Sequence, residues 1–219
     1  MKQKYTGRNS SVADLLSYAE NASRQLEELG GSALDKSALE KEISELEKKV
    51  YILAKSLSEK RKSAAEKMSL DVEKILCSLG MKDTKFRVGL TEKEGNAVEQ
   101  KCGPYGMDNI EFLISANPGS PLNPLAKIAS GGELSRVMLA LKTILSDGDL
   151  AGTLVFDEID TGIGGEVAVS VGSHMKKLAE KKQILCITHL ASIAVYADNQ
   201  IKIEKGVEGN TTASNIFAV

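Results

Sequence analysis

The chain has 219 residues, of which 42% are hydrophobic and 26% are charged, and its formal net charge is −2. The length and composition predict one large or two small globular domains and exclude a disordered or fibrous protein. The near-neutral charge excludes nucleic-acid binding by the net charge of the whole chain, but a local basic patch could still bind nucleic acid. Three cysteines and two histidines build neither a disulfide framework nor a zinc site, and no apolar run approaches the roughly 20 residues that span a bilayer, so we expect a cytoplasmic protein without membrane insertion.

Residues 1–79 are expected to be helical, because they contain no proline and are rich in Leu, Ala, Glu, Lys and Ser. An apolar seam with spacings of 4, 3, 4, 3 and 4 is typical of a coiled coil, and it consists of Leu39, Ile43, Leu46, Val50, Leu53 and Leu57. A weaker seam precedes it, formed by Leu15, Ala19, Ala22, Leu26 and Leu29. The stretch Gly30-Gly31-Ser32 lies between the seams and is expected to break the helix.

Two start signals support a pair of consecutive helices in this region. Ser11 with Asp14, and Ser37 with Glu40, have the spacing of a capping box. The narrow seam and the dense charge opposite it indicate one partner helix; the alternative is an ordinary helical bundle that closes on itself. Beyond Leu57 the apolar stripe widens, which suits a helix that docks on a globular body.

Strands and helices alternate after Gly80. Strands are expected at 84–90, 110–116, 153–156 and 184–187, helices at about 132–146 and 165–180, a proline-rich connection at 117–124, and a closing hairpin from 200–204 and 212–218. The strand, helix, strand order predicts a parallel βαβ unit. Its apolar strands do not alternate with polar residues, which predicts burial on both faces.

Two carboxylates, Asp157 and Glu158, follow the strand at 153–156. Ligands of open α/β sheets bind at the carboxyl ends of strands, and an apolar run followed by Asp-Glu is a Walker B pattern. Asp157 would then hold Mg²⁺ and Glu158 would polarise the attacking water. A strand end with solvated acids is the alternative.

A glycine pair opens the helix upstream, in the block Ser130-Gly131-Gly132-Glu133-Leu134-Ser135. Adjacent glycines allow close approach of a phosphate, and a helix N-terminus presents free N–H groups to an anion. The alternative is a turn whose Ser and Glu only cap the helix. His189, at the end of the last parallel strand, is placed to reach the same phosphate edge, whereas His174 is expected to be structural.

The order of SGGELS, FDEIDTGIGG and THL, together with the longer string KIASGGELSRVMLALK, resembles the carboxyl-terminal half of an SMC-class ABC-type ATPase, and most closely a bacterial recombination and repair member of that class. The resemblance runs through residues 80–219. It implies an α/β fold, the carboxyl-terminal lobe of an ABC/SMC-type P-loop ATPase head, preceded by a long antiparallel coiled-coil arm. Residues 1–79 would be the returning arm and residues 80–219 the lobe.

The resemblance also implies roles for single residues. The signature motif, which contacts ATP on the other subunit of a head-to-head dimer, would be Ser130, Gly131, Gly132 and Glu133, with Ala129 where many relatives have leucine. The remaining implied positions are Asp157 for Mg²⁺, Glu158 for catalysis, Asp160 to Gly164 for the D-loop at the dimer interface, and His189 as the switch histidine. DNA, and double-strand breaks in particular, would be the implied target, with the protein on the nucleoid.

None of the 19 glycines is followed by lysine, so the chain has no G-x-x-x-x-G-K-[ST] phosphate loop. The chain alone is therefore expected to be inactive, and an amino-terminal half with Walker A is the expected partner, as for a carboxyl-terminal fragment or a split reading frame. Two alternatives stay open: a non-enzymatic interaction module, or half of another coiled-coil ABC ATPase of SMC, RecF-like or SbcC-like type. An ABC transporter subunit is disfavoured, because its domain has no long coil before the signature motif.

Overall fold

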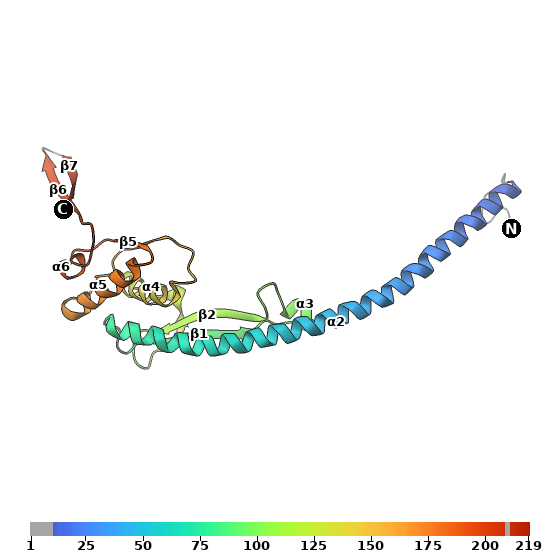
Figure 1. The fold of residues 1–219 in the computed structure, drawn as a ribbon, viewed down its shortest axis with the longest axis horizontal. Helices are drawn as coiled ribbons and strands as arrows, with labels where there is room; N and C mark the ends of the chain where they lie inside the picture. The colour runs from blue at the N-terminus through green and yellow to red at the C-terminus, as the bar shows by residue number, and fades with distance from the viewer. Residues whose placement is uncertain (1–10, 209–210) are drawn as a thin grey trace. The chain divides into compact units, whose positions relative to one another are not determined.

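The computed structural model describes residues 11–208 and 211–219, without the side chains of residues 29–35 and 207–213. The chain divides into two units. One comprises the residues up to 58 together with 93–107, and the other comprises residues 59–92 and 108–219. Each unit is described in turn, with the element labels of Figure 1.

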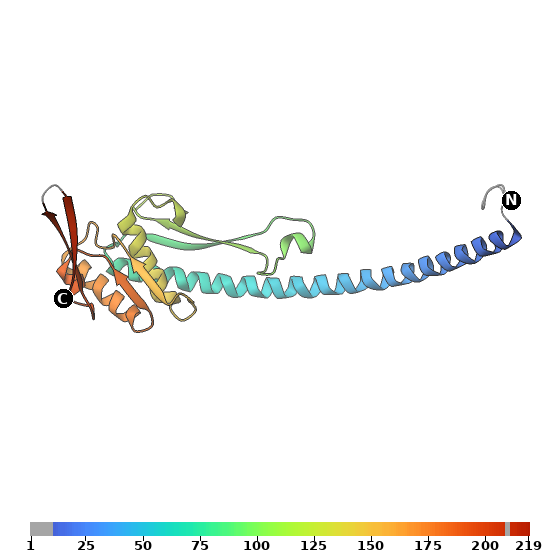
Figure 2. The same ribbon diagram turned by 90° about the horizontal axis from the view of Figure 1, so that it is seen from above.

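The first helix, α2, is continuous from Val12–Ser78 (Figures 1 and 2). At its start, the Ser11 backbone N–H donates to Asp14 Oδ2 at 2.6 Å, and the Asp14 N–H donates to Ser11 Oγ at 3.2 Å, which confirms the first capping box. The predicted break at Gly30-Gly31-Ser32 and the second start at Ser37 are wrong. A helical glycine costs only about 1 kcal/mol relative to alanine, and no proline is present to stop the helix.

The first unit leaves the predicted seam of α2 largely open. The six residues of the predicted seam, from Leu39 to Leu57, have relative exposures between 38% and 70%. A short helix, α3 (Val98–Lys101), lines a groove with α2 that includes Ile43, Val50 and Val98. Among the described residues no long helix pairs with α2, so the alternative of a self-closing bundle is wrong.

The second unit contains an antiparallel sheet in the order β1-β2-β3. Strand β1 (Lys85–Glu92) pairs with β2 (Asp108–Ser115), with Phe86 opposite Ile114. The sequence predicted both strands but not their register. The proline-rich connection adds a two-residue strand, β3 (Asn123–Pro124), and a 3₁₀ turn, η1 (Leu125–Lys127). These two short elements were not predicted.

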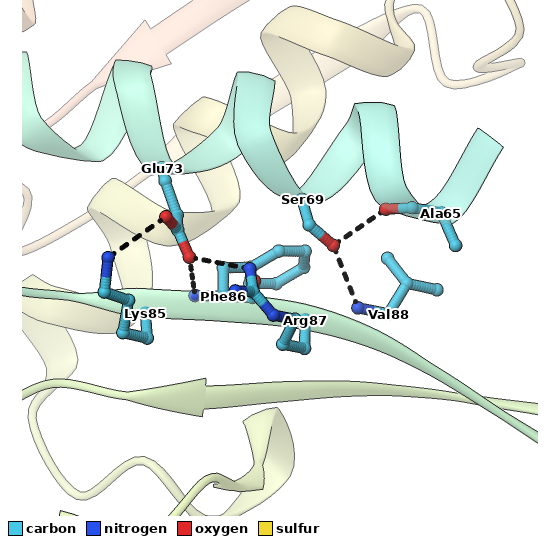
Figure 3. A network of polar contacts seen from close by, with 7 residues as sticks. All are labelled: Ala65, Ser69, Glu73, Lys85, Phe86, Arg87 and Val88. Carbon is cyan, nitrogen blue, oxygen red and sulfur yellow. Dashed lines mark hydrogen bonds and ion pairs between the residues drawn. The ribbon is translucent and has the colours of Figure 1, made fainter. Parts of the chain in front are cut away.

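Side chains of α2 bind the open edge of β1 (Figure 3). The Phe86 N–H donates to Glu73 Oε1 at 3.0 Å, and the Val88 N–H donates to Ser69 Oγ at 3.2 Å. Ser69 in turn donates to the Ala65 carbonyl at 2.7 Å. Strand N–H groups that have no strand neighbour are thus paired with helix side chains, which stabilises the edge.

The βαβ unit has the predicted order and a parallel pairing. It consists of β4 (Thr153–Phe156), α5 (Gly165–Ala179) and β5 (Gln183–Cys186), and the helix α4 (Gly131–Leu145) precedes it. A short helix, α6 (Ala191–Ala194), and an antiparallel hairpin of β6 (Ile201–Glu208) and β7 (Thr211–Ala218) complete the chain (Figure 2).

The core of the second unit joins the last turns of α2 to the β1-β2-β3 sheet, to the parallel pair β4-β5, and to α4 and α5. Its fully buried members include Leu76, Phe86, Leu139, Ile159 and Val171. The expectation that the parallel strands are buried on both faces is wrong.

One face of β4 and β5 packs on this core. On the opposite face, Val155 is 64% exposed and its β5 neighbour Leu185 is 50% exposed. None of the described helices is long and apolar enough to cross a membrane.

Candidate nucleotide-binding site

The two carboxylates of the predicted Walker B motif, Asp157 and Glu158, lie directly after β4. Both side chains are exposed, and Asp157 Oδ1 accepts the Glu158 backbone N–H at 2.8 Å. Glu158 has φ 56°, and it is the only non-glycine residue with positive φ among the described residues. A left-handed glutamate costs about 1–2 kcal/mol, so the surrounding contacts must hold this turn in place.

The signature block begins α4 beside these acids. Ser130 is the N-cap, and its Oγ accepts the Glu133 N–H at 3.4 Å, as the capping alternative predicted. A Cβ built on Gly131 would lie 2.0 Å from Glu158 Oε2. The Glu158 carboxylate therefore lies over the start of α4, and a side chain at position 131 would displace it.

Two further residues of α4 fasten the loop after β4. Ser135 Oγ donates to the Asp157 carbonyl at 2.7 Å. The buried Arg136 guanidinium donates from one terminal nitrogen to the carbonyls of Ile159 at 3.3 Å and Thr161 at 3.0 Å. Burial lowers the pKa of Arg136 from its usual range, while the nearby Glu133 raises it. The start of α4 and the loop after β4 are thus directly connected by side-chain hydrogen bonds.

Asp160 joins the Walker B loop to the residues after β5. Its Oδ2 accepts the Thr188 hydroxyl at 2.6 Å and the His189 backbone N–H at 2.9 Å, and it lies 3.0 Å from His189 Nδ1. The Asp160 side chain is only 6% exposed, whereas that of His189 is 77% exposed. Asp160 therefore points into the chain, and the imidazole of His189 points out from it.

The electrostatics of this cluster follow from its contacts. Burial alone would raise the pKa of Asp160, but the Thr188 and His189 hydrogen bonds together lower it below its usual range. Cys186, at the end of β5, is half-buried, and burial together with Asp160 and Asp157 raises its pKa to about 11. The site thus keeps a carboxylate charged and a neighbouring thiol protonated.

The predicted site residues are brought together at one end of the βαβ unit. The signature glycines contact Glu158, and His189 contacts Asp160. Sequence reasoning missed the contributions of Arg136 and Thr188. Arg136 carried a usable signal, because it is a charged residue next to the apolar run Val137 to Leu141 of the same helix.

The residues present fit Mg²⁺ and a nucleotide phosphate. Mg²⁺ in nucleotide sites is held by one or two carboxylates, with phosphates and water completing the octahedron. Asp157 offers one exposed carboxylate, and nowhere in the described part of the chain do three or more His, Cys, Asp or Glu side chains form a metal site of their own. The N–H groups at the start of α4 and the Ser130 hydroxyl are suited to an anion.

His174 lies away from these residues, on α5. Its Nε2 is 3.1 Å from Ser78 Oγ at the end of α2. Burial, and then the nearby Lys177, lower its pKa below the usual histidine value. These contacts agree with the structural role expected from the sequence.

Comparison with known proteins places the chain in a family. No family model matches it. It is 48% identical over 219 residues to the DNA repair protein RecN of Treponema pallidum (strain Nichols), and the match covers 99% of this chain and 38% of that protein. It is 35% identical over 225 residues to RecN of Bacillus subtilis (strain 168), again with 99% and 38% covered. The chain thus spans about two fifths of the length of these relatives.

The fold has a counterpart among solved structures. The Smc head domain with a coiled coil and joint from Pyrococcus yayanosii has a TM-score of 0.56 at 18% identity, with 97% of this chain and 37% of that chain covered. The fold is that of the carboxyl-terminal lobe of an SMC-type ABC ATPase head, preceded by its coiled-coil arm. Within that class, the chain belongs with the carboxyl-terminal half of the RecN DNA repair proteins.

Proposed function

We propose that the chain is the carboxyl-terminal part of an ATP-dependent DNA repair ATPase. It supplies the signature motif, Walker B, D-loop and switch histidine, and it hydrolyses ATP only with an amino-terminal half that carries Walker A. The observation that carries the proposal is the convergence of Glu158, His189 and the start of α4 at one end of the βαβ unit. Hydrolysis by two engaged heads and binding to DNA in the nucleoid follow from the resemblance to RecN.

The chemistry of each group is set by its position. Bound Mg²⁺ would neutralise phosphate charge, and Asp157 is the exposed carboxylate placed to hold it. Glu158 orients the attacking water and accepts its proton, for which an exposed carboxylate on a rigid turn is suited. Ser130 and the N–H groups at the start of α4 bind phosphate oxygens of the nucleotide on the other subunit of the dimer, and His189 contacts the phosphate edge from β5.

Uncovered apolar surface supports the need for a second half. Val155, Leu185 and Ile187 are exposed by 64%, 50% and 60% on one face of the parallel strands. The seam of α2 is open as well. In a two-part head, the amino-terminal half would cover the sheet face, and its ascending helix would pair with the seam. The same partner would therefore bury both surfaces.

ATP hydrolysis tests the proposal directly. The chain is co-expressed with a RecN amino-terminal half containing Walker A, and Mg²⁺-dependent phosphate release is measured for the complex and for the chain alone. We expect turnover only in the complex. Glu158→Gln should lower kcat by at least about 100-fold, because it removes a carboxylate that acts in the transition state. Glu166→Gln, an exposed acid in the first turn of α5, is the matched control and should retain activity.

Each contrary outcome has a defined reading. Turnover by the chain alone that Glu158→Gln abolishes would contradict the requirement for the amino-terminal half. A stable complex without any ATP hydrolysis would favour a non-enzymatic interaction module.

Stimulation of turnover by linear duplex DNA, but not by closed circles of the same sequence, is expected if DNA ends are the target.

A further inference from the structure

Asp160 holds three contacts on a single carboxylate oxygen. Oδ2 accepts the Thr188 hydroxyl at 2.6 Å and the His189 backbone N–H at 2.9 Å, and it lies within 3.0 Å of His189 Nδ1. The side chain of Asp160 is 6% exposed. A carboxylate buried in this way has little surface left to contact a nucleotide or a second subunit. Its contacts are instead with Thr188 and His189 of its own chain.

The contact to Nδ1 fixes one tautomer of the imidazole. An ionised carboxylate only accepts hydrogen bonds, so an Oδ2 atom 3.0 Å from Nδ1 favours the form in which Nδ1 carries the proton. In neutral His189 the Nε2 atom then has the free lone pair. The ring is 77% exposed, so this nitrogen is available to a ligand.

The loop that carries Asp160 is itself held from the signature helix. Arg136 donates to the carbonyls of Ile159 and Thr161, the residues on either side of Asp160. The backbone of Asp160 is therefore fixed by α4, while its side chain fixes the residues after β5. The three segments of the site are linked through this one residue.

We propose that Asp160 is a positioning residue that sets the tautomer and orientation of His189, and that it is not a nucleotide contact. The proposal rests on the proposed function for the role of His189. A phosphate oxygen only accepts hydrogen bonds, so Nε2 must gain a proton to bind one, and an Nδ1–H held by Asp160 makes Nε2 the nitrogen that does so. The Thr188 hydroxyl is the second support of the same oxygen. Removing Asp160 should release the ring while leaving the other site residues in place.

The test reads the tautomer by NMR in the 219-residue chain, without nucleotide. The chain has only two histidines, so long-range ¹H–¹⁵N correlation spectra are simple, and His189→Gln assigns the signals. We expect neutral His189 to be mainly the Nδ1–H form, and this form to become the minor one in Asp160→Ala. Asp198→Ala, which removes a carboxylate that pairs with Lys176, is the matched control and should leave the ratio unchanged.

The wild-type spectrum alone can overturn the proposal. If the Nε2–H form predominates in wild type, or if folded Asp160→Ala keeps the wild-type ratio, Asp160 does not position the ring. This readout is independent of catalysis, so an inactive complex would refute the proposed function and leave the tautomer result standing.

A kinetic arm in the complex separates positioning from nucleotide binding. Asp160→Ala and His189→Ala should lower kcat by the same factor, with no further loss in the double variant and with KM within about twofold of wild type. A selective rise of KM in Asp160→Ala would instead identify a nucleotide contact and overturn the proposal.

Discussion

The contact between α2 and the edge of β1 gives a prediction for stability. Glu73 Oε1 accepts the Phe86 N–H at 3.0 Å and also lies 3.0 Å from the Arg87 guanidinium. Phe86 is fully buried and the Glu73 side chain is only 17% exposed, so little water reaches this N–H. Replacing Glu73 by alanine therefore leaves a buried donor without a partner.

The magnitude follows from these contacts. An unsatisfied buried N–H costs about 1–3 kcal/mol. The ion pair with Arg87, whose side chain is 51% exposed, adds at most about 1 kcal/mol because solvent screens it. Glu73→Ala should thus destabilise the chain by about 2–3 kcal/mol. Glu73→Gln keeps an oxygen acceptor for the Phe86 N–H and should cost only about 1 kcal/mol.

Urea unfolding followed by circular dichroism measures both variants. Glu66→Ala is the matched control, because Glu66 is an exposed acid on the same helix, two turns earlier, and its loss should change stability by less than about 0.5 kcal/mol. If Glu73→Ala behaved like Glu66→Ala, the pairing of the strand edge by helix side chains would contribute nothing, and the reasoning would be refuted. Equal losses for alanine and glutamine would assign the effect to charge alone.

Three further predictions concern the candidate site. A Cβ on Gly132 would lie 3.1 Å from the carbonyl oxygen of Glu158, so Gly132→Ala should destabilise the chain by about 1–3 kcal/mol and lower the Tm by several degrees. Gly148→Ala is the control, because a Cβ there meets nothing closer than 4.0 Å. Equal Tm values for the two variants would contradict the prediction. Folding lowers the pKa of Asp160, so the stability that this carboxylate contributes is complete above its unfolded pKa of about 3.9 and is lost as the pH falls through the folded value. In Asp160→Asn, the urea midpoint should therefore fall less steeply at acid pH than in wild type. Parallel plots of urea midpoint against pH for the two proteins would contradict this prediction. The Cys186 thiol, with its pKa raised to about 11, should react with iodoacetamide at pH 8 far more slowly than exposed Cys77, as peptide mass spectrometry can measure, unless the buried environment is absent in solution.

Local patterns predicted most of the fold. The strand Thr153–Phe156 was predicted residue for residue, because an apolar run between turn residues has few alternatives. The break at Gly30-Gly31-Ser32 was not a valid inference, since the cost of two glycines is small against a helix of 67 residues. The short helices α3 and α6 escaped prediction because four residues carry no periodicity.

The candidate site was predictable only where its residues end regular elements. Asp157, Glu158 and His189 follow apolar strands, and parallel strands bring their carboxyl ends to one edge. Arg136 bonds to backbone carbonyls, and Thr188 bonds to a single carboxylate oxygen of Asp160. In both cases the partner is more than twenty residues away in sequence. Such pairs depend on the tertiary arrangement, which periodicity does not encode.

The exposed sheet face connects the stability of the chain with its proposed assembly. Burying one large aliphatic side chain stabilises a protein by about 1.5–3 kcal/mol. Val155, Leu185 and Ile187 are each at least half exposed, so covering all three would contribute on the order of 3–5 kcal/mol after allowing for their present burial. This is a large fraction of the roughly 5–15 kcal/mol by which an ordinary domain is stable. A half that covers this face would therefore stabilise the same strands that carry Asp157, Glu158 and His189, so that assembly of the head and ordering of the site would be a single event.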